Sequence, residues 1–138
     1  MTVYLDTSSL IKLYVEEPDS TKIQSLVITA TAIVTSIISY AEARATFARL
    51  FRKRIITRAQ SRQATQQLDA DWPRFVVIEL NREIGHSAGR LAESLALAGA
   101  DAVHLASFEA LISRCDDDVE FSGADDRLVR AARSLGQN

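Results

Sequence analysis

Short apolar runs of strand length alternate with helical patterns along the chain, and this alternation limits the possible folds more than any other feature. The apolar runs lie at 3–5, 32–35, 75–80 and 119–121. The helical patterns lie at about 7–15, 19–29, 37–54, 57–71, 82–97, 102–114 and 126–135. Strands separated by helices need crossover connections, which produce a parallel sheet with helices on both faces. We therefore predict an α/β fold.

The size and composition indicate a globular chain without a disulfide framework. A length of 138 residues with 47% apolar residues suits one domain with one core. A lone Cys115 and two His argue against an internal disulfide and a dedicated zinc site, so carboxylates would hold any metal. The uncharged stretch 23–41 contains many Ser, Thr and Gln, which favours a strand with flanking helices over a membrane span. With no signal peptide pattern at the start, we expect a cytoplasmic protein.

Four acidic residues stand where a strand ends or a helix begins. Asp6 ends the first strand, Glu42 lies in the first turns after the second, Asp101 begins a helix, and Asp125 follows the fourth strand. Each has an ordinary alternative role, because Asp is a favoured helix cap and Glu42 has capping-box spacing from Ser39. Ligands of open α/β sheets bind beyond the carboxyl ends of the strands. Carboxylates gathered there would repel one another, and a hard cation such as Mg²⁺ or Mn²⁺ would relieve that repulsion.

Four short segments also carry a resemblance to a known family. They are Val3 to Tyr14 (VYLDTSSLIKLY), Ser39 to Arg44 (SYAEAR), Gly99 to Ala106 (GADAVHLA) and Asp125 to Ala132 (DDRLVRAA). In order and spacing they resemble the motifs of PIN domains, especially the VapC-type toxins of type II toxin–antitoxin pairs. Each motif is short, but the ordered set covers almost the whole chain.

The resemblance implies a fold and a function. The fold would be a single PIN-like domain over residues 1–138, with a central parallel sheet of four to five strands flanked by helices on both faces. The function would be that of a toxin, a metal-dependent endoribonuclease that hydrolyses RNA with carboxylate-bound Mg²⁺ or Mn²⁺. The implied partners are RNA, a cognate VapB-type antitoxin and a second copy of the chain, with no membrane involved.

The resemblance also assigns roles to the acids. Asp6, Glu42 and Asp101 match the three principal acidic positions, and Asp125 matches the fourth because it stands two residues before Arg-Leu. All four are therefore expected to be catalytic and to bind the metal. Asp126 is the alternative to Asp125.

Ser8, Gly123, His104 and the segment 135–138 complete the comparison with the family. Ser8 matches a small polar residue beside the first acid, so it is expected to support the site. Gly123 stands where many relatives carry Thr or Ser. Many relatives also continue into a final strand where this chain has 135–138, which predicts an uncovered sheet edge. His104, one helical turn after Asp101, is expected to pack or to form a hydrogen bond.

Basic residues are concentrated in one stretch without acids. Between 44 and 62 there are seven, namely Arg44, Arg49, Arg52, Lys53, Arg54, Arg58 and Arg62. We expect the first five of these to contact RNA phosphates beside the acidic site. The alternatives are a solvated helix face and a docking surface for an acidic protein partner.

Two other functions are compatible with parts of the pattern. A PIN-like module that binds RNA or a protein without cleaving RNA is the main alternative, although such modules usually lack at least one acid and this chain has all four. A phosphoacceptor receiver domain also has acids at strand ends. It needs paired acids after the first strand and a late Lys, whereas here Thr7 follows Asp6 and no Lys follows Lys53.

Overall fold

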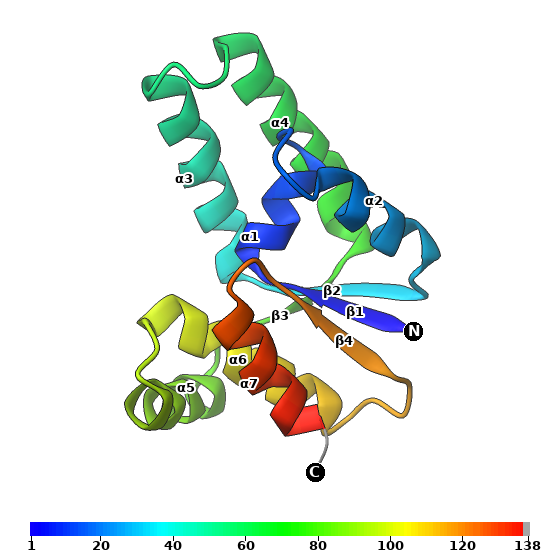
Figure 1. The fold of residues 1–138 in the computed structure, drawn as a ribbon, viewed down its shortest axis with the longest axis vertical. Helices are drawn as coiled ribbons and strands as arrows, with labels where there is room; N and C mark the ends of the chain where they lie inside the picture. Colours follow the sequence, from blue (N-terminus) through cyan, green and yellow to red (C-terminus); the bar gives the residue numbers. More distant parts are fainter. Residues whose placement is uncertain (137–138) are drawn as a thin grey trace.

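A four-stranded parallel sheet lies between two groups of helices in the computed structural model, which describes residues 1–136 (Figure 1). The strands are β1 (Thr2–Leu5), β2 (Ala32–Ser36), β3 (Val76–Ile78) and β4 (Val119–Ser122). The helices are α1 (Thr7–Leu10), α2 (Ser20–Thr29), α3 (Ile38–Arg52), α4 (Arg58–Asp71), α5 (Arg82–Leu95), α6 (Gly99–Ile112) and α7 (Asp126–Gly136). Two short 3₁₀ turns, η1 (Ile11–Leu13) and η2 (Trp72–Arg74), complete the list. The predicted α/β fold with a parallel sheet is confirmed.

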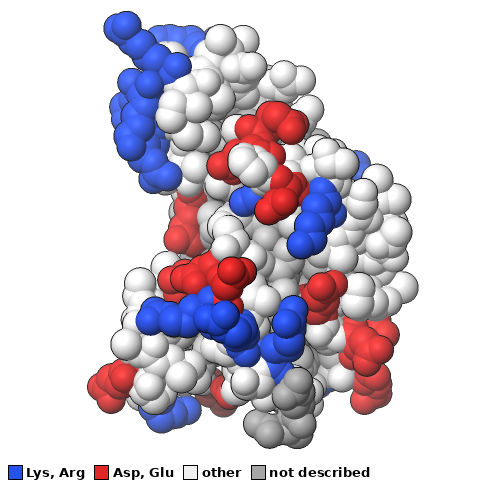
Figure 2. Space-filling view, in the orientation of Figure 1, with Lys and Arg blue, Asp and Glu red and all other residues white. Residues whose placement is uncertain are grey.

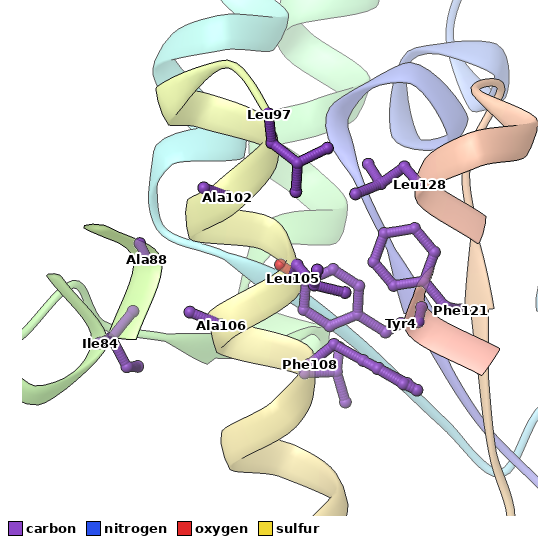
Figure 3. Close-up of a cluster of buried hydrophobic side chains, with 12 residues drawn as sticks. Tyr4, Ile84, Ala88, Leu97, Ala102, Leu105, Ala106, Phe108, Phe121 and Leu128 are labelled. Carbon is purple, nitrogen blue, oxygen red and sulfur yellow. The ribbon is translucent and has the colours of Figure 1, made fainter. Parts of the chain in front are cut away.

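Successive residues of β1 point to opposite faces of the sheet, and each face has its own core. Tyr4 points to the face covered by α5, α6 and α7, where Leu105 and Phe108 of α6 and Phe121 of β4 pack with its ring (Figure 3). Val3 and its neighbours on the other face pack against α1, α2, α3 and α4. This alternation is the normal geometry of a strand, and helices must cover both faces of the sheet when both carry apolar side chains.

The strand order β3-β2-β1-β4 makes β1 the point where the chain changes direction across the sheet. The chain passes from β1 to β2 and β3 on one side, and then returns to place β4 on the other side of β1. In α/β sheets the crevice at such a switch point is the usual ligand site. Asp6 is the residue directly after β1, so the topology places it at this crevice.

Several element boundaries differ from the sequence-based expectation. The helix expected at 7–15 is divided into α1 and η1, and the strand expected at 75–80 is limited to Val76–Ile78. Pro73 lies at the start of η2, where its fixed φ favours a tight turn before the strand. The stretch 23–41 forms the end of α2, β2 and the start of α3. These shifts change the ends of elements and leave their order intact.

The structure of residues 1–136 bears on two expectations, the uncovered sheet edge and the absence of a membrane span. β4 pairs only with β1 in this part of the chain, so the predicted sheet edge is present; Gln137 and Asn138 lie outside the described residues. No single described helix is long and apolar enough to cross a membrane. By length and composition alone, only α5 and α6 taken together pass that test, with a bend of 117° between them.

Candidate active site

All four predicted acids line one pocket of about 300 Å³ at the carboxyl ends of the strands. Asp6 comes from the end of β1, Glu42 from α3, Asp101 from α6 and Asp125 from the loop before α7. The other residues of the pocket wall are Thr7, Ser8, Ile11, Thr46, Arg49 and His104. Asp126, the alternative fourth acid, lines a different groove between α2 and β4. The topology therefore brings together side chains that are far apart in the sequence.

Asp6 is both a helix cap and part of the pocket. Its Oδ1 accepts hydrogen bonds from the Ser9 amide at 3.0 Å and from the Ser8 hydroxyl at 2.6 Å, which caps α1. No residue of the described chain donates to its Oδ2. Burial raises the pKa of the Asp6 carboxyl and the charge of Asp101 adds to the rise, although its hydrogen bonds and His104 oppose it. Asp6 is thus a buried carboxyl group that forms no ion pair with the residues the structure describes.

Gly123 provides the space for the second oxygen of Asp6. A Cβ at this position would lie 2.5 Å from Asp6 Oδ2 and 3.0 Å from its Cγ, closer than real Cβ atoms come. The Ser8 hydroxyl, which donates to Asp6, accepts a hydrogen bond from the Ala124 amide at 2.9 Å. Ser8 therefore connects the β4–α7 loop to Asp6.

Glu42 does not complete a capping box. Helix α3 begins at Ile38, and the hydroxyl of the buried Ser39 accepts a hydrogen bond from Thr35 instead of capping the helix. Glu42 Oε1 accepts hydrogen bonds from Thr7 Oγ1 at 2.5 Å and from His104 Nε2 at 3.3 Å. The hydrogen bond from His104 is the main cause that lowers the pKa of the Glu42 carboxyl.

His104 forms the hydrogen bonds that were expected of it, and it lies at the centre of a network. The ring is 2% exposed, with Nδ1 2.8 Å from the Tyr4 hydroxyl and Nε2 3.1 Å from Thr7 Oγ1. Thr7 was not predicted as a site residue. The only sequence signal for it is its place directly after Asp6, and its contact with Glu42 depends on the packing of α1 against α3.

Asp101 and Asp125 have different local roles. Asp101 lies in the first turn of α6, whose cap position is Ala98, so Asp101 is not a helix cap. Asp125 Oδ1 accepts hydrogen bonds from the amides of Arg127 at 2.9 Å and Leu128 at 3.4 Å, as a cap of α7 does. The capping role proposed as an alternative thus holds for Asp125 and fails for Asp101.

The donor chemistry of the pocket fits a hard divalent cation. Within residues 1–136, no three His, Cys, Asp or Glu side chains already stand close enough together to hold one ion. However, the pocket contains four carboxylates, and neither Asp6 Oδ2 nor Glu42 Oε2 receives a hydrogen bond from the described residues. Carboxylate oxygens and water are the ligands that Mg²⁺ and Mn²⁺ prefer.

The basic residues between 44 and 62 have different surroundings. Arg49 lines the acidic pocket, two turns along α3 from Glu42. Arg44 lies against Tyr40 instead, with its guanidinium 5.7 Å from the ring centre and a hydrogen bond of 3.2 Å to the hydroxyl. Arg52, Lys53 and Arg54 are exposed at the end of α3. Figure 2 shows Lys and Arg gathered along α3 and again over α7, with acidic side chains between the two groups.

The family-model comparison identifies the fold family. Residues 3–122 match the PIN domain model, which covers Asp6, Glu42 and Asp101 but ends before Asp125. The chain belongs to the PIN-domain family. The predicted resemblance to PIN domains is therefore confirmed.

Curated relatives of this PIN domain include two VapC proteins. Ribonuclease VapC45 of Mycobacterium tuberculosis strain CDC 1551 and Ribonuclease VapC49 of strain H37Rv are each 35% identical over 105 residues. Each alignment covers 76% of this chain and 73% of the relative.

Two solved structures share the fold of this PIN domain. FitAcB from Neisseria gonorrhoeae has a TM-score of 0.71 and 16% identity, over 95% of this chain and 93% of that chain. VapBC2 from Rickettsia felis, bound to a DNA fragment from its promoter, has a TM-score of 0.57 and 19% identity, over 80% and 81%. The predicted PIN-like fold is therefore confirmed.

Proposed function

We propose that this PIN-domain protein is a Mg²⁺- or Mn²⁺-dependent endoribonuclease and the toxin of a type II toxin–antitoxin pair. The observation that carries the proposal is the single pocket in which Asp6, Glu42, Asp101 and Asp125 meet. The curated relatives are named ribonucleases, which supports RNA as the substrate. The pocket has no cysteine in its wall, and its only histidine is already bonded on both ring nitrogens, so carboxylates carry the chemistry.

Each of the four acids would contribute a carboxylate oxygen to the bound ion. Asp6 and Glu42 are held by protein donors on one oxygen each, which leaves their other oxygens for a cation. Asp101 enters the pocket from α6 and Asp125 from the loop before α7. Mg²⁺ or Mn²⁺ held by these residues would supply an activated water and would stabilise the charge on the leaving oxygen of a phosphodiester.

Arg49 is the basic residue best placed to bind the RNA backbone at the site. It lines the acidic pocket, so its guanidinium can hold a phosphate next to the carboxylates. Arg52, Lys53 and Arg54 extend the same positive surface along α3 and would contact neighbouring phosphates (Figure 2). Arg44 donates a hydrogen bond to the Tyr40 hydroxyl and lies over the Tyr40 ring. It is therefore the basic residue for which we expect the weakest contact with RNA.

The proposed protein partners follow from the same family. A VapB-type antitoxin would restrain the nuclease, and two copies of the chain would form a homodimer. Large apolar side chains on the described surface offer contact area for such partners: Ile28 is 81% exposed, Val76 is 52% exposed and Leu80 is 48% exposed.

The substitution Asp101→Asn tests the nuclease proposal most directly. Asp101 makes no side-chain hydrogen bond to the described residues, so the change removes a charge without removing a structural contact. We expect RNA cleavage in Mn²⁺ to fall by roughly 100-fold or more, the usual cost of losing a group that acts on the transition state. Asp116→Asn, in the exposed turn before β4, is the matched control and should cleave normally.

Two results would contradict this function. The first is cleavage at the full rate by Asp101→Asn or in excess EDTA. The second is RNA binding by the wild-type protein with no cleavage in Mg²⁺ or Mn²⁺, which would favour the non-catalytic binding module instead.

A further inference from the structure

We infer that Tyr4 and His104 form a buried positioning pair that fixes the Glu42 carboxylate in the pocket. The inference rests on the proposed function, because it concerns a proposed metal ligand. Tyr4 is fully buried in β1, and His104 is 2% exposed in α6. Between them they connect the core of the sheet to a carboxylate whose side chain is 36% exposed. Neither residue is one of the four acids, and neither is needed as a nucleophile.

The acceptor at the end of the network sets the direction of its hydrogen bonds. An ionised carboxylate accepts and never donates, so the contact of 3.3 Å between His104 Nε2 and Glu42 Oε1 requires the proton on Nε2. In the neutral ring Nδ1 is then an acceptor, and the Tyr4 hydroxyl must donate to it across 2.8 Å.

The core holds the Tyr4 ring in place. The ring stacks on Phe121 with centroids 5.3 Å apart, and it meets Phe108 edge-on at 6.1 Å (Figure 3). The His104 ring meets Tyr4 edge-on at 5.9 Å. The pair is therefore fixed by packing on the α6 face of the sheet, before any ligand arrives.

Glu42 needs such a support more than the other acids do. A Glu side chain has one more rotatable bond than Asp, so a half-exposed Glu has several conformations available in the absence of a fixed donor. Thr7 and His104 both donate to Oε1, and together they select one of these conformations and leave Oε2 for the pocket. Partners of this kind commonly change the metal affinity of a site by about 10–100-fold.

The first test compares two tyrosines that each lose a hydroxyl. Tyr4→Phe keeps the ring and removes the donor to His104. Tyr14→Phe is the matched control, because its hydroxyl donates to Asp71 at 2.8 Å, away from the pocket. Mn²⁺ binding to the metal-free protein is measured by isothermal titration calorimetry without RNA. We expect Tyr4→Phe to weaken binding by about tenfold, the lower end of that range, and Tyr14→Phe to bind like the wild type.

A second pair of variants separates the N–H group from general packing. His104→Gln keeps an N–H donor on a side chain of similar size, whereas His104→Leu keeps the volume alone. We expect His104→Gln to retain most of the Mn²⁺ affinity and His104→Leu to lose it, with the Michaelis constant for RNA unchanged in both. This pair also serves if Tyr4→Phe fails to fold, which circular dichroism would show.

The outcomes distinguish this inference from the proposed function. Equal affinity in Tyr4→Phe and wild type, equal losses in the two tyrosine variants, or equal losses in the two His104 variants would each overturn the positioning role. A wild-type protein that does not bind Mn²⁺ would overturn the proposed function, and the inference with it.

Discussion

The two carboxylate oxygens of Asp6 have separate tasks, and this separation determines how substitutions at the residue will behave. Oδ1 caps α1 through the Ser9 amide and the Ser8 hydroxyl, while Oδ2 is left beside Gly123. Asn keeps an oxygen for the cap and removes the charge. Ala removes both. The helix cap and the metal ligand can therefore be separated by experiment at one position.

The raised pKa of Asp6 predicts the sign of a pH effect on stability. Burial raises the pKa above the ordinary 3.8, so the folded protein binds this proton more tightly than the unfolded chain does. Wild-type stability then falls as the pH rises from 3.8 through the folded-state pKa, and Asp6→Asn escapes that loss. In EDTA, Asp6→Asn should unfold at higher urea concentration than wild type at pH 7.5, with a smaller difference at pH 4.

Asp6→Ala provides the control for this effect. It should be less stable than Asp6→Asn at both pH values by about 1 kcal/mol, the usual value of a lost helix cap. A wild type at least as stable as Asp6→Asn at pH 7.5 in EDTA would show that burial of the Asp6 charge does not destabilise the fold.

Gly123 gives a second prediction at the scale of one residue. In Gly123→Ala the new methyl group would meet Asp6 Oδ2 at 2.5 Å and Phe121 at 3.2 Å, so the carboxylate or the loop must move. We expect a loss of about 1–3 kcal/mol in the free energy of unfolding, as for other overpacked sites, together with weaker Mn²⁺ binding. Urea denaturation and calorimetry measure the two effects.

Gly89→Ala is the matched control for Gly123→Ala. A Cβ at Gly89 meets nothing within 4 Å and the residue lies inside α5. The change should stabilise the protein by about 0.5–1 kcal/mol because Ala favours a helix. If both variants gain stability, the space beside Asp6 is not restricted.

The sequence supported the prediction of the acids better than that of the residues that hold them. Asp6 and Glu42 follow apolar runs, so the rule that ligands bind at the carboxyl ends of strands was enough to select them. Thr7 and Gly123 offer no such signal. Thr7 contacts Glu42, which is 35 residues away in the sequence. Gly123 matters because it has no Cβ, which leaves space for Asp6 Oδ2. Contacts of this kind depend on how helices and loops pack, and no local pattern encodes them.

At the scale of the elements, the order of helices and strands was predictable from the sequence, whereas the residues that cap the helices were only partly predictable. The spacing from Ser39 to Glu42 fits a capping box, yet α3 begins before Ser39 and both side chains are bonded elsewhere. The capping box that does form joins Thr57 and Gln60 at the start of α4, which has the same kind of spacing. The pattern is necessary for the motif, but the box forms only where the helix begins directly after the Ser or Thr, as α4 does after Thr57.

Helix α3 presents different side chains on different faces, and this predicts unequal roles for its arginines. Glu42, Thr46 and Arg49 follow one another at helical spacing along the pocket wall. Arg44 faces Tyr40 and α4 instead. We expect Arg49→Gln to weaken RNA binding and to reduce the slope of log affinity against log salt by about 1, the effect of one lost phosphate contact.

Arg44→Gln is the control for this comparison, because it removes the same charge from the same helix. It should leave the salt slope unchanged in filter-binding measurements on the Asp101→Asn protein, which does not degrade the RNA. Equal effects of the two substitutions would mean that the whole basic stretch acts as a diffuse positive field.

For the whole molecule, charge is arranged in space in a way that the net charge of −2 conceals. The acidic pocket lies at the switch point of the sheet, between basic side chains on α3 and on α7 (Figure 2). The fold class follows from the alternation of elements, since strands separated by helices need parallel crossovers, whereas the order of the strands in the sheet was not predicted. The sequence did not reveal that the two helix groups enclose the acids, because that depends on the packing of both cores against β1.

This arrangement predicts that a divalent cation stabilises the entire fold. The carboxylates of the pocket come from the end of β1, from α3, from α6 and from the loop before α7, so an ion shared among them connects both sides of the sheet. Only the folded chain brings these groups together. At 100 times its dissociation constant, Mn²⁺ should therefore add about 2.7 kcal/mol to the free energy of unfolding and raise the Tm by roughly 5–10 °C. Differential scanning calorimetry with and without EDTA measures this shift.

The matching variants decide whether the shift comes from the pocket. Asp101→Asn removes one proposed ligand from α6, so it should lose most of the Mn²⁺-induced rise in Tm. Asp116→Asn removes an exposed acid from a turn outside the pocket and should retain the full rise. A rise of the same size in both variants would place the ion elsewhere on the acidic surface. In that case the four carboxylates would repel one another in the native protein without the cation that we propose to hold them.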